Sequence, residues 1–387
     1  MEPSDDHTPA SAPAAFIHSP ALEQYPYPPT CPFNTSRAGR ARAILESMGM
    51  LTNGDRIEMA PEPADRAAML TFHTARYLDA LEQAPRGRLD VVPFEMGLGT
   101  PDCPIFEGMY EYGALACGAS LKGADLILAG EVRAAFNPSG GLHHARPALA
   151  AGFCYINDVA IACLKLAAAG RRVLFLDVDA HHSDGVQGAF AHRRDVMTIS
   201  MHESGRTLYP GTGFENDIGA GDGEGYAVNL PMPPAVHDEA FLRAFREVAV
   251  PLIGAFDPDV IVFELGMDAL AGDPLTHLSL TNNAHADALA RVLAFGKPLL
   301  ATGGGGYHVP NTARGWALVW AVLTGQDDGA DEPTAGLGGV MLETTAWHGG
   351  LRDRRLAPDA RTRAVVDRAV ADTIERVKQA VFPHHGL

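Results

Sequence analysis

The sequence has few cysteines, little positive charge and no long hydrophobic run. Its 387 residues include 5 cysteines, and no two of them form the C-x-x-C pair of a zinc knuckle or a redox dithiol. Lysine and arginine number 30 against 47 aspartates and glutamates, and the resulting net charge of −17 disfavours direct binding to nucleic acid. The sequence contains no run of about 18 apolar residues, so we expect no membrane span, and the N-terminus lacks a signal-peptide pattern. These absences favour a cytoplasmic protein.

The sequence does have enough apolar material for a large core, with 47% hydrophobic residues. We expect residues 1–14, rich in proline, alanine and serine, to be a disordered tail, and residues 15–387 to be a single domain. Apolar runs of strand length then alternate with helical patterns, which is typical of parallel strands covered by helices on both faces. The predicted strands span residues 124–129, 173–178, 196–201, 226–230, 260–265 and 298–302. The predicted helices span residues 36–48, 64–81, 106–121, 153–169, 238–256, 284–294, 312–323 and 359–381.

Acidic and imidazole groups follow the predicted strands, at the edge where parallel sheets bind ligands. Asp179 and His181 follow the strand at 173–178 and, being two residues apart on an extended chain, point to the same side. Asp268 follows the strand at 260–265 and completes a set of three ligands, which leaves a position for water as in catalytic metal sites. The alternative is that Asp179 and His181 form a buried hydrogen-bonded pair without a metal.

Two further motifs supply candidate acid, base and oxyanion groups. His143 and His144 lie in a glycine-rich turn; they are either general acid/base groups oriented by Asp177 and Asp184, or imidazoles that bond to the loop backbone. The glycine run at 303–306 lacks the lysine and hydroxyl residue of a phosphate-binding loop. It instead brings the phenol of Tyr307 to the metal, where it can stabilise a developing oxyanion. The absence of G-x-S-x-G and H-E-x-x-H motifs argues against a serine hydrolase and a zincin.

Six motifs, in order along the chain, resemble those of the histone deacetylase superfamily. They are SGGLHHA (139–145), AGFCY (151–155), DVDAHHSDGVQ (177–187), YPGTG (209–213), DALAGDPL (268–275) and GGGGY (303–307). The resemblance covers nearly the whole chain and is strongest to the bacterial acetoin-utilisation deacetylases, close to class I. It implies the arginase/deacetylase α/β fold, with a central eight-stranded parallel sheet flanked by helices.

The resemblance also implies a catalytic metal. One Zn²⁺, with Fe²⁺ as an alternative occupant, would be held by Asp179, His181 and Asp268. His144 would act as general base and acid, with support from Asp184.

Three more residues have implied roles around this metal. His143, paired with Asp177, would tune the electrostatics of the site. Tyr307 would polarise the acyl carbonyl, and Arg37 would line an internal cavity through which acetate leaves.

The resemblance further implies substrate and potassium contacts. Phe153 and Tyr209 would form the walls of an acyl-lysine tunnel, with Gly152 at its throat and Leu275 at its rim, while Asp102 would grip the substrate backbone. Structural K⁺ would bind at two sites, the first formed by Asp177, Asp179, His181, Ser200 and Met201, and the second by Phe190, Arg193, Val196 and Tyr226.

We therefore expect a zinc-dependent enzyme that hydrolyses the amide of acetyl-lysine, or a related acyl-lysine, in proteins and peptides. Met267 precedes Asp268 where the related arginases carry a further aspartate ligand, so we expect one metal rather than two. A small-molecule amidohydrolase such as an acetylpolyamine deacetylase is the alternative, and a non-catalytic acyl-lysine-binding protein is a third. The sequence leaves the oligomeric state open.

Overall fold

The computed structural model describes residues 13–87, 91–327, 329 and 350–387. Eight strands form one sheet in the order β2-β1-β3-β8-β7-β4-β5-β6, and every neighbouring pair is parallel. This confirms the predicted eight-stranded parallel sheet. The strands are β1 (Ala14–Ile17), β2 (Arg56–Met59), β3 (Ala134–Asn137), β4 (Val173–Asp177), β5 (Val196–Glu203), β6 (Ala227–Met232), β7 (Val260–Glu264) and β8 (Leu299–Thr302). Residues 1–12 of the expected tail lie outside the described residues, whereas Ala14 is the first residue of β1.

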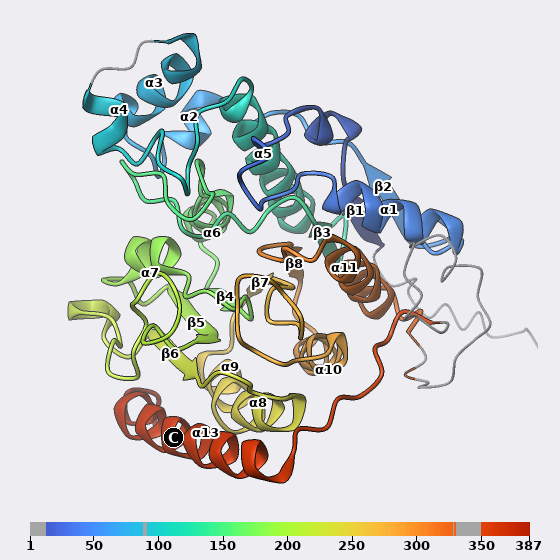
Figure 1. Ribbon diagram of the computed structural model, residues 1–387, viewed down its shortest axis with the longest axis vertical. Helices are drawn as coiled ribbons and strands as arrows, with labels where there is room; N and C mark the ends of the chain where they lie inside the picture. Colours follow the sequence, from blue (N-terminus) through green and yellow to red (C-terminus); the bar gives the residue numbers. More distant parts are fainter. Residues whose placement is uncertain (1–12, 88–90, 328, 330–349) are drawn as a thin grey trace, which may run out of the picture.

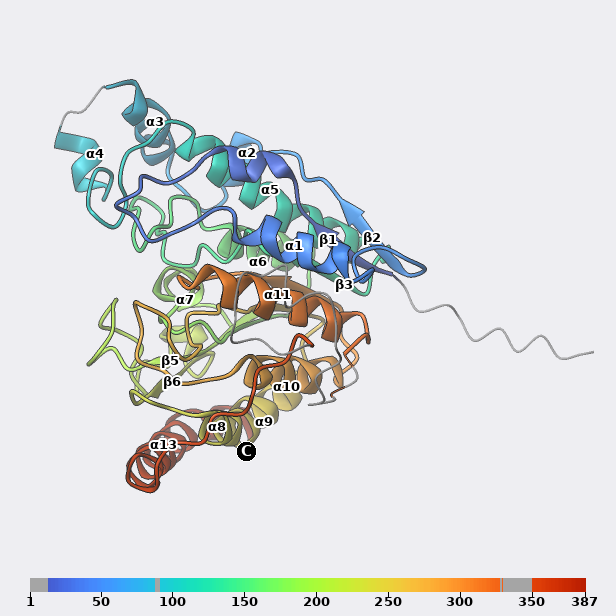
Figure 2. The ribbon, with the colours of Figure 1, turned by 45° about the vertical axis from the view of Figure 1, so that its right-hand side comes forward.

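Helices cover both faces of the sheet (Figures 1 and 2). The described α-helices are α1 (Arg37–Ser47), α2 (Arg66–Met69), α3 (Ala75–Gln83), α4 (Val91–Glu95), α5 (Met109–Leu128), α6 (Asp158–Ala168), α7 (Asp184–Phe190), α8 (Asp238–Ala244), α9 (Val250–Phe256), α10 (Asn282–Leu293), α11 (Val309–Leu323) and α13 (Ala360–Val381). No helix among these is long and apolar enough to cross a membrane.

Alternate residues along β1, β3, β4, β7 and β8 enter different cores, which explains why these strands are almost entirely apolar. Leu174 of β4 packs in the core formed with α1, α8, α9, α10, α11 and α13. Its neighbour Phe175 packs in the core formed with α5, α6 and α7. The sheet is therefore the middle layer between two layers of helices.

The predicted strand at 124–129 is wrong, because most of this segment is the last part of α5. A short apolar run that is buried all round has the same pattern in a strand and in a helix, so periodicity alone does not separate them. The strand at this place in the chain is β3, which has only 4 residues. The predicted helix at 153–169 begins later, at Asp158, where the side chain of Asn157 caps the first turn.

Candidate active site

The carboxyl ends of neighbouring strands bring the predicted site residues together. The sheet order β3-β8-β7-β4 places the loops that follow these four strands next to one another. The loop after β3 carries His143 and His144, and the loop after β8 carries Tyr307. The loop after β7 carries Asp268, and the loop after β4 carries Asp179 and His181.

Asp179, His181 and Asp268 form a buried group of one imidazole and two carboxylates. The Nδ1 atom of His181 lies 3.2 Å from Oδ1 of Asp179 and 2.8 Å from Oδ2 of Asp268. Ligands bound to a tetrahedral zinc at about 2.0–2.2 Å are about 3.4 Å apart, so small side-chain shifts would fit these atoms around a metal ion.

The glycine run after β8 holds the carboxylates of this group in place. The N–H of Gly305 donates to Oδ2 of Asp179 at 2.6 Å, and a Cβ at Gly305 would lie 2.1 Å from Oδ2 of Asp268. Only glycine therefore allows the backbone to come this close. Behind the run, Arg37 donates from Nη1 to the carbonyl of Gly306 at 2.9 Å. The Gly305 bond fixes an oxygen of Asp179, and the Arg37 bond fixes the glycine run behind it, as the outer shell of a metal site would.

The charge of the three-residue group also suits a cation. Burial lowers the pKa of His181, but the Asp268 and Asp179 carboxylates outweigh it and raise the pKa to about 10. Burial and the charge of Asp179 raise the pKa of Asp268 to about 7. The group thus takes up a proton that a divalent ion would replace, and the residues fit the metal that the sequence predicts.

His144 lies in an environment that keeps it neutral. Burial and the charge of His143 lower the pKa of His144 to about 4. Its Nδ1 atom is 2.7 Å from Oδ1 of Asp184, and Arg146 donates to Oδ2 of Asp184 from Nη2 at 2.6 Å and from Nε at 3.1 Å. Burial raises the pKa of Asp184, but the bonds from His144 and Arg146 leave it below the usual range. The ionised carboxylate accepts the Nδ1 hydrogen, so Nε2 of His144 carries the lone pair that can act as a base. This atom lies 3.2 Å from Nε2 of His143.

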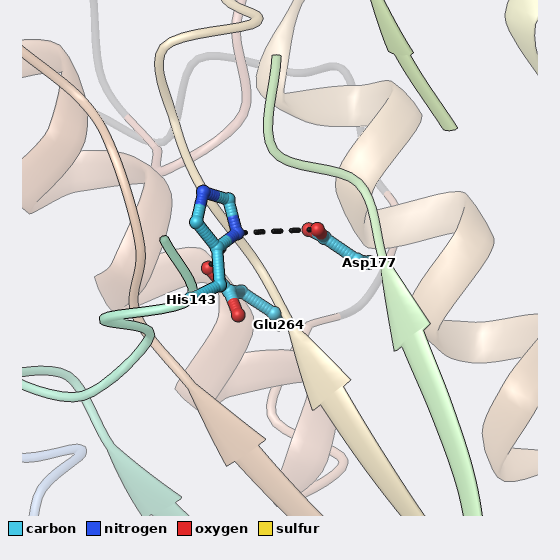
Figure 3. A group of neighbouring side chains, drawn as sticks. All are labelled: His143, Asp177 and Glu264. Atoms are coloured by element: carbon cyan, nitrogen blue, oxygen red, sulfur yellow. Dashed lines mark ion pairs between the residues drawn. The ribbon is translucent and has the colours of Figure 1, made fainter. Parts of the chain in front are cut away.

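His143 lies between two carboxylates rather than the one that the sequence predicts (Figure 3). Its Nδ1 atom is 3.3 Å from Oδ2 of Asp177 and 2.8 Å from Oε1 of Glu264. Asp177 and Glu264 are register partners at the ends of β4 and β7. Burial lowers the pKa of His143, but the two carboxylates outweigh it and leave the pKa well above its usual value. The two carboxylates therefore favour the protonated, positively charged form of His143.

Glu264 is the site residue that the sequence reasoning missed. The prediction considered the residues that follow each strand, whereas Glu264 is the last residue of β7 itself. The available signal was a carboxylate in an otherwise apolar strand, because a buried charge needs a partner.

Asn157 and Asp158 hold the histidine loop from the start of α6. The side-chain amide of Asn157 donates to the carbonyls of His143 at 3.0 Å and Ala145 at 2.9 Å. The carboxylate of Asp158 accepts the N–H of Leu142 at 2.8 Å. The loop thus has fixed anchors before, between and after its two imidazoles.

Tyr307 faces the candidate metal group. Its ring centroid is 6.3 Å from that of His181, and burial raises the pKa of its phenol well above the usual value, so the group stays a neutral donor. Asp273 connects this residue to the predicted rim, because its carboxylate accepts the N–H of Tyr307 at 2.7 Å and the N–H of Leu275 at 2.9 Å.

The residues predicted to contact substrate lie beside these groups. Tyr209 is 42% exposed, and its ring centroid is 5.1 Å from that of His144. A Cβ at Gly152 would lie 2.3 Å from Cδ2 of His144, which explains the glycine there. Phe153 is 5.7 Å from the Tyr307 ring, centroid to centroid. Asp102 is exposed, and its carbonyl accepts the N–H of Phe153 at 3.2 Å.

The residues predicted for potassium lie in two places around β5. At the first, Asp177 of β4 is the register partner of Ser200 on β5, and Met201 follows on the same strand. At the second, the N–H of Arg193 donates to the carbonyl of Phe190 at 2.9 Å in the turn before β5. The remaining two are Val196, the first residue of β5, and Tyr226, which precedes β6.

Comparison with known proteins identifies the family. A sequence model of the histone deacetylase domain matches residues 31–323. The chain belongs to the histone deacetylase family. It is 39% identical over 328 residues to the acetoin utilization protein AcuC of Bacillus subtilis, a match that covers 83% of this chain and 84% of that protein. Histone deacetylase 8 of Xenopus tropicalis is 39% identical over 299 residues, with 77% of this chain and 80% of that protein covered.

Solved structures of this family share the fold. The crystal structure of a histone deacetylase homologue from Aquifex aeolicus has a TM-score of 0.85 and 30% identity, and covers 95% of this chain and 100% of that one. The structure of a histone deacetylase homologue complexed with SAHA has a TM-score of 0.84. The predicted family and fold are confirmed, and as a family member the protein is a deacetylase, a hydrolase of acetyl amides.

Proposed function

We propose that this histone deacetylase family member is a zinc-dependent lysine deacetylase that hydrolyses the amide of acetyl-lysine in proteins. The observation that carries the proposal is the convergence of three chemical groups. The ring of His181, within the candidate metal group, lies 5.7 Å from the neutral ring of His144 and 6.3 Å from the neutral phenol of Tyr307, centroid to centroid. Amide hydrolysis requires an electrophile, a base and an oxyanion donor, and these groups match the three needs.

The protein's own residues then divide the proton transfers. A zinc ion held by Asp179, His181 and Asp268 would supply a Lewis acid that polarises the amide carbonyl and acidifies water. His144 takes the proton of the attacking water at Nε2, and Asp184 stabilises the positive charge that the ring gains. The same Nε2 then donates the proton to the departing lysine amine.

Tyr307 and His143 adjust the charge around this transfer. The Tyr307 phenol donates a hydrogen bond to the carbonyl oxygen as that oxygen gains negative charge. The charge on His143 helps to keep the pKa of His144 low, so that His144 is unprotonated when water attacks. Phe153 and Tyr209 flank these groups and would exclude water from the acyl chain.

We also propose that K⁺ binds in the two predicted places around β5. The support is chemical, because hydroxyl, carboxylate and backbone carbonyl oxygens are the ligands that hard cations prefer. At the first place, Ser200 offers a hydroxyl oxygen and Asp177 a carboxylate. At the second place, Phe190 and Tyr226 offer backbone carbonyl oxygens.

The net charge of −17 further suits a basic, lysine-rich protein substrate.

Acetate release from an acetyl-lysine peptide tests the proposed function. The purified, zinc-loaded protein is expected to turn the peptide over, Asp268→Ala is expected to be inactive, and the control Glu239→Ala, an exposed carboxylate on α8, is expected to match the wild type. N-acetylputrescine is assayed in parallel. A kcat/KM for N-acetylputrescine more than about tenfold above that for the peptide would support the small-molecule alternative instead.

A further inference from the structure

We infer that Glu203, the last residue of β5, is a positioning residue that sets the spacing of two loops at the entrance and thereby the selectivity among acyl-lysine substrates. The inference rests on the proposed function, because the two loops carry Tyr209 and Leu275, which are proposed to contact substrate. Glu203 itself is buried beneath the loops, with no exposed side-chain surface, and it touches none of the reacting groups named above.

One carboxylate joins both loops. Oε1 of Glu203 accepts the hydroxyl hydrogen of Thr207 at 2.9 Å and lies 2.9 Å from Nδ1 of His277. Oε2 accepts the backbone N–H of His277 at 2.8 Å. An ionised carboxylate only accepts, so the Nδ1 atom of His277 must carry the hydrogen.

The partners of Glu203 lie close in sequence to the proposed walls of the entrance. Thr207 comes two residues before Tyr209, and His277 comes two residues after Leu275. The two loops are separated by more than sixty residues of sequence, and this side chain holds both. A change in Glu203 therefore acts on both walls at once.

The backbone of Glu203 ties this arrangement to the metal-ligand loop. Its N–H donates to the carbonyl of Ala180 at 2.8 Å, and Ala180 lies between Asp179 and His181. The N–H of Ala180 donates to Oδ1 of Asp268 at 2.8 Å. The walls are thus fixed relative to the candidate metal group as well as to each other, which is the condition for selecting substrates by size.

The variant Glu203→Gln tests the inference. Glutamine keeps one acceptor oxygen but replaces the other with an amide NH₂, so in either orientation it cannot accept all of the hydrogens that Thr207 and His277 donate to Glu203. With acetyl-lysine and butyryl-lysine peptides, we expect the ratio of the two kcat/KM values to change at least about fivefold, while kcat on the acetyl peptide stays within about threefold. A change in KM with kcat kept indicates lost binding contacts rather than lost chemistry.

Two other variants control for general destabilisation. Glu215→Gln is a matched control, because Glu215 follows the Tyr209 loop and pairs with Arg376 on α13 at 3.0 Å without contacting Glu203; its ratio is expected to equal that of the wild type. Thr207→Val removes one contact and leaves the buried carboxylate in place. It is expected to shift the ratio of the two kcat/KM values in the same direction as Glu203→Gln but by less. If Glu203→Gln does not fold, Thr207→Val provides the test instead.

Limited trypsin digestion measures loop opening without relying on activity. Arg206 lies in the Tyr209 loop and is exposed, and cleavage after it reports the population of the open loop. We expect faster cleavage there in Glu203→Gln and Thr207→Val than in the wild type or Glu215→Gln. Unchanged cleavage and an unchanged substrate ratio in both variants would overturn the inference. If cleavage rises but the wild type hydrolyses no acyl-lysine peptide, Glu203 positions the loop and the proposed function is wrong.

Discussion

Two buried groups of one histidine and two carboxylates lie at the carboxyl ends of β4 and β7, and they are built differently. In each group the three candidate ligand atoms lie within 4.8 Å of one another. In the Asp179–His181–Asp268 group, backbone amides of Gly305 and Ala180 bind the carboxylate oxygens. In the His143–Asp177–Glu264 group, the N–H of Asp179 binds Asp177, but among the described residues Glu264 has only His143 close to its carboxylate, with Oε1 2.8 Å from Nδ1.

The protonation of the two groups also differs: burial raises the pKa of Asp268 in the first group and of both Asp177 and Glu264 in the second, whereas the pKa of Asp179 is lowered. Burial raises the pKa of Asp179, but His181 and His143 outweigh it and keep the carboxylate ionised, as a metal ligand must be. Burial and the charge of Asp177 instead hold the pKa of Glu264 well above its usual value, although His143 opposes this. The comparison teaches that two groups of one histidine and two carboxylates differ in support: backbone amides bind both carboxylates of the candidate metal group but only Asp177 in the other group.

The largest expected effect is the loss of kcat in a His144 variant, which should exceed the loss in the matching His143 variant. His144→Ala removes the group that is proposed to carry the proton, so we expect kcat on an acetyl-lysine peptide to fall by about 10²–10⁴-fold. His143→Ala removes a charge but not the transferring atom, and should cost less. Both kcat values are measured with metal content verified as unchanged; equal, small losses would contradict the assignment.

A smaller loss of kcat is expected at Tyr307, whose ring lies 6.3 Å from that of His181 in the candidate metal group. Tyr307→Phe removes only the hydrogen-bond donor, and losing one oxyanion donor typically costs about 10²–10³-fold in kcat. KM should change little, because the ring remains in contact with Phe153. Steady-state kinetics of the purified variant provide the measurement. Near-wild-type turnover would make Tyr307 a structural residue.

The smallest effect concerns Glu264, which tests the second group. Glu264→Gln removes a carboxyl group that, in its ionised form, raises the pKa of His143, so His143 loses its proton at a lower pH. The charge on His143 then no longer lowers the pKa of His144, and that pKa should rise from about 4 in the wild type. Because His144 must be neutral to act as a base, the acidic limb of the kcat–pH profile should move to higher pH, with less than about a tenfold loss of kcat at pH 8. An unmoved acidic limb would show that Glu264 does not control this charge.

The sequence predicted the parts of this protein that local pattern determines. The apolar runs of β4, β5, β7 and β8 marked the strands, and the residues after β4, β7 and β8 marked the candidate metal group and Tyr307. The histidine pair was found from its glycine-rich motif, although the strand before it was misplaced. The strands β1 and β2 escaped prediction because β1 begins within the residues taken for a tail, and β2, with the sequence RIEM, is not an apolar run.

The supporting contacts escaped prediction because they join distant parts of the chain. Arg146 meets Asp184 across 38 residues, and Glu203 meets His277 across 74. Only the packed sheet brings such pairs together, so their pairing is a property of the tertiary structure. The disordered tail, the single-domain organisation and the cytoplasmic location stay predictions.

The number of metal ions bound per chain tests the central claim most directly, because the two groups are matched in residue types. Metal analysis of the purified protein after loading with Zn²⁺ and removal of excess is expected to give one ion per chain for the wild type and for Glu264→Gln, and none for His181→Ala. Two tightly bound ions in the wild type, or loss of the ion in Glu264→Gln but not in His181→Ala, would contradict the assignment of the metal to Asp179, His181 and Asp268.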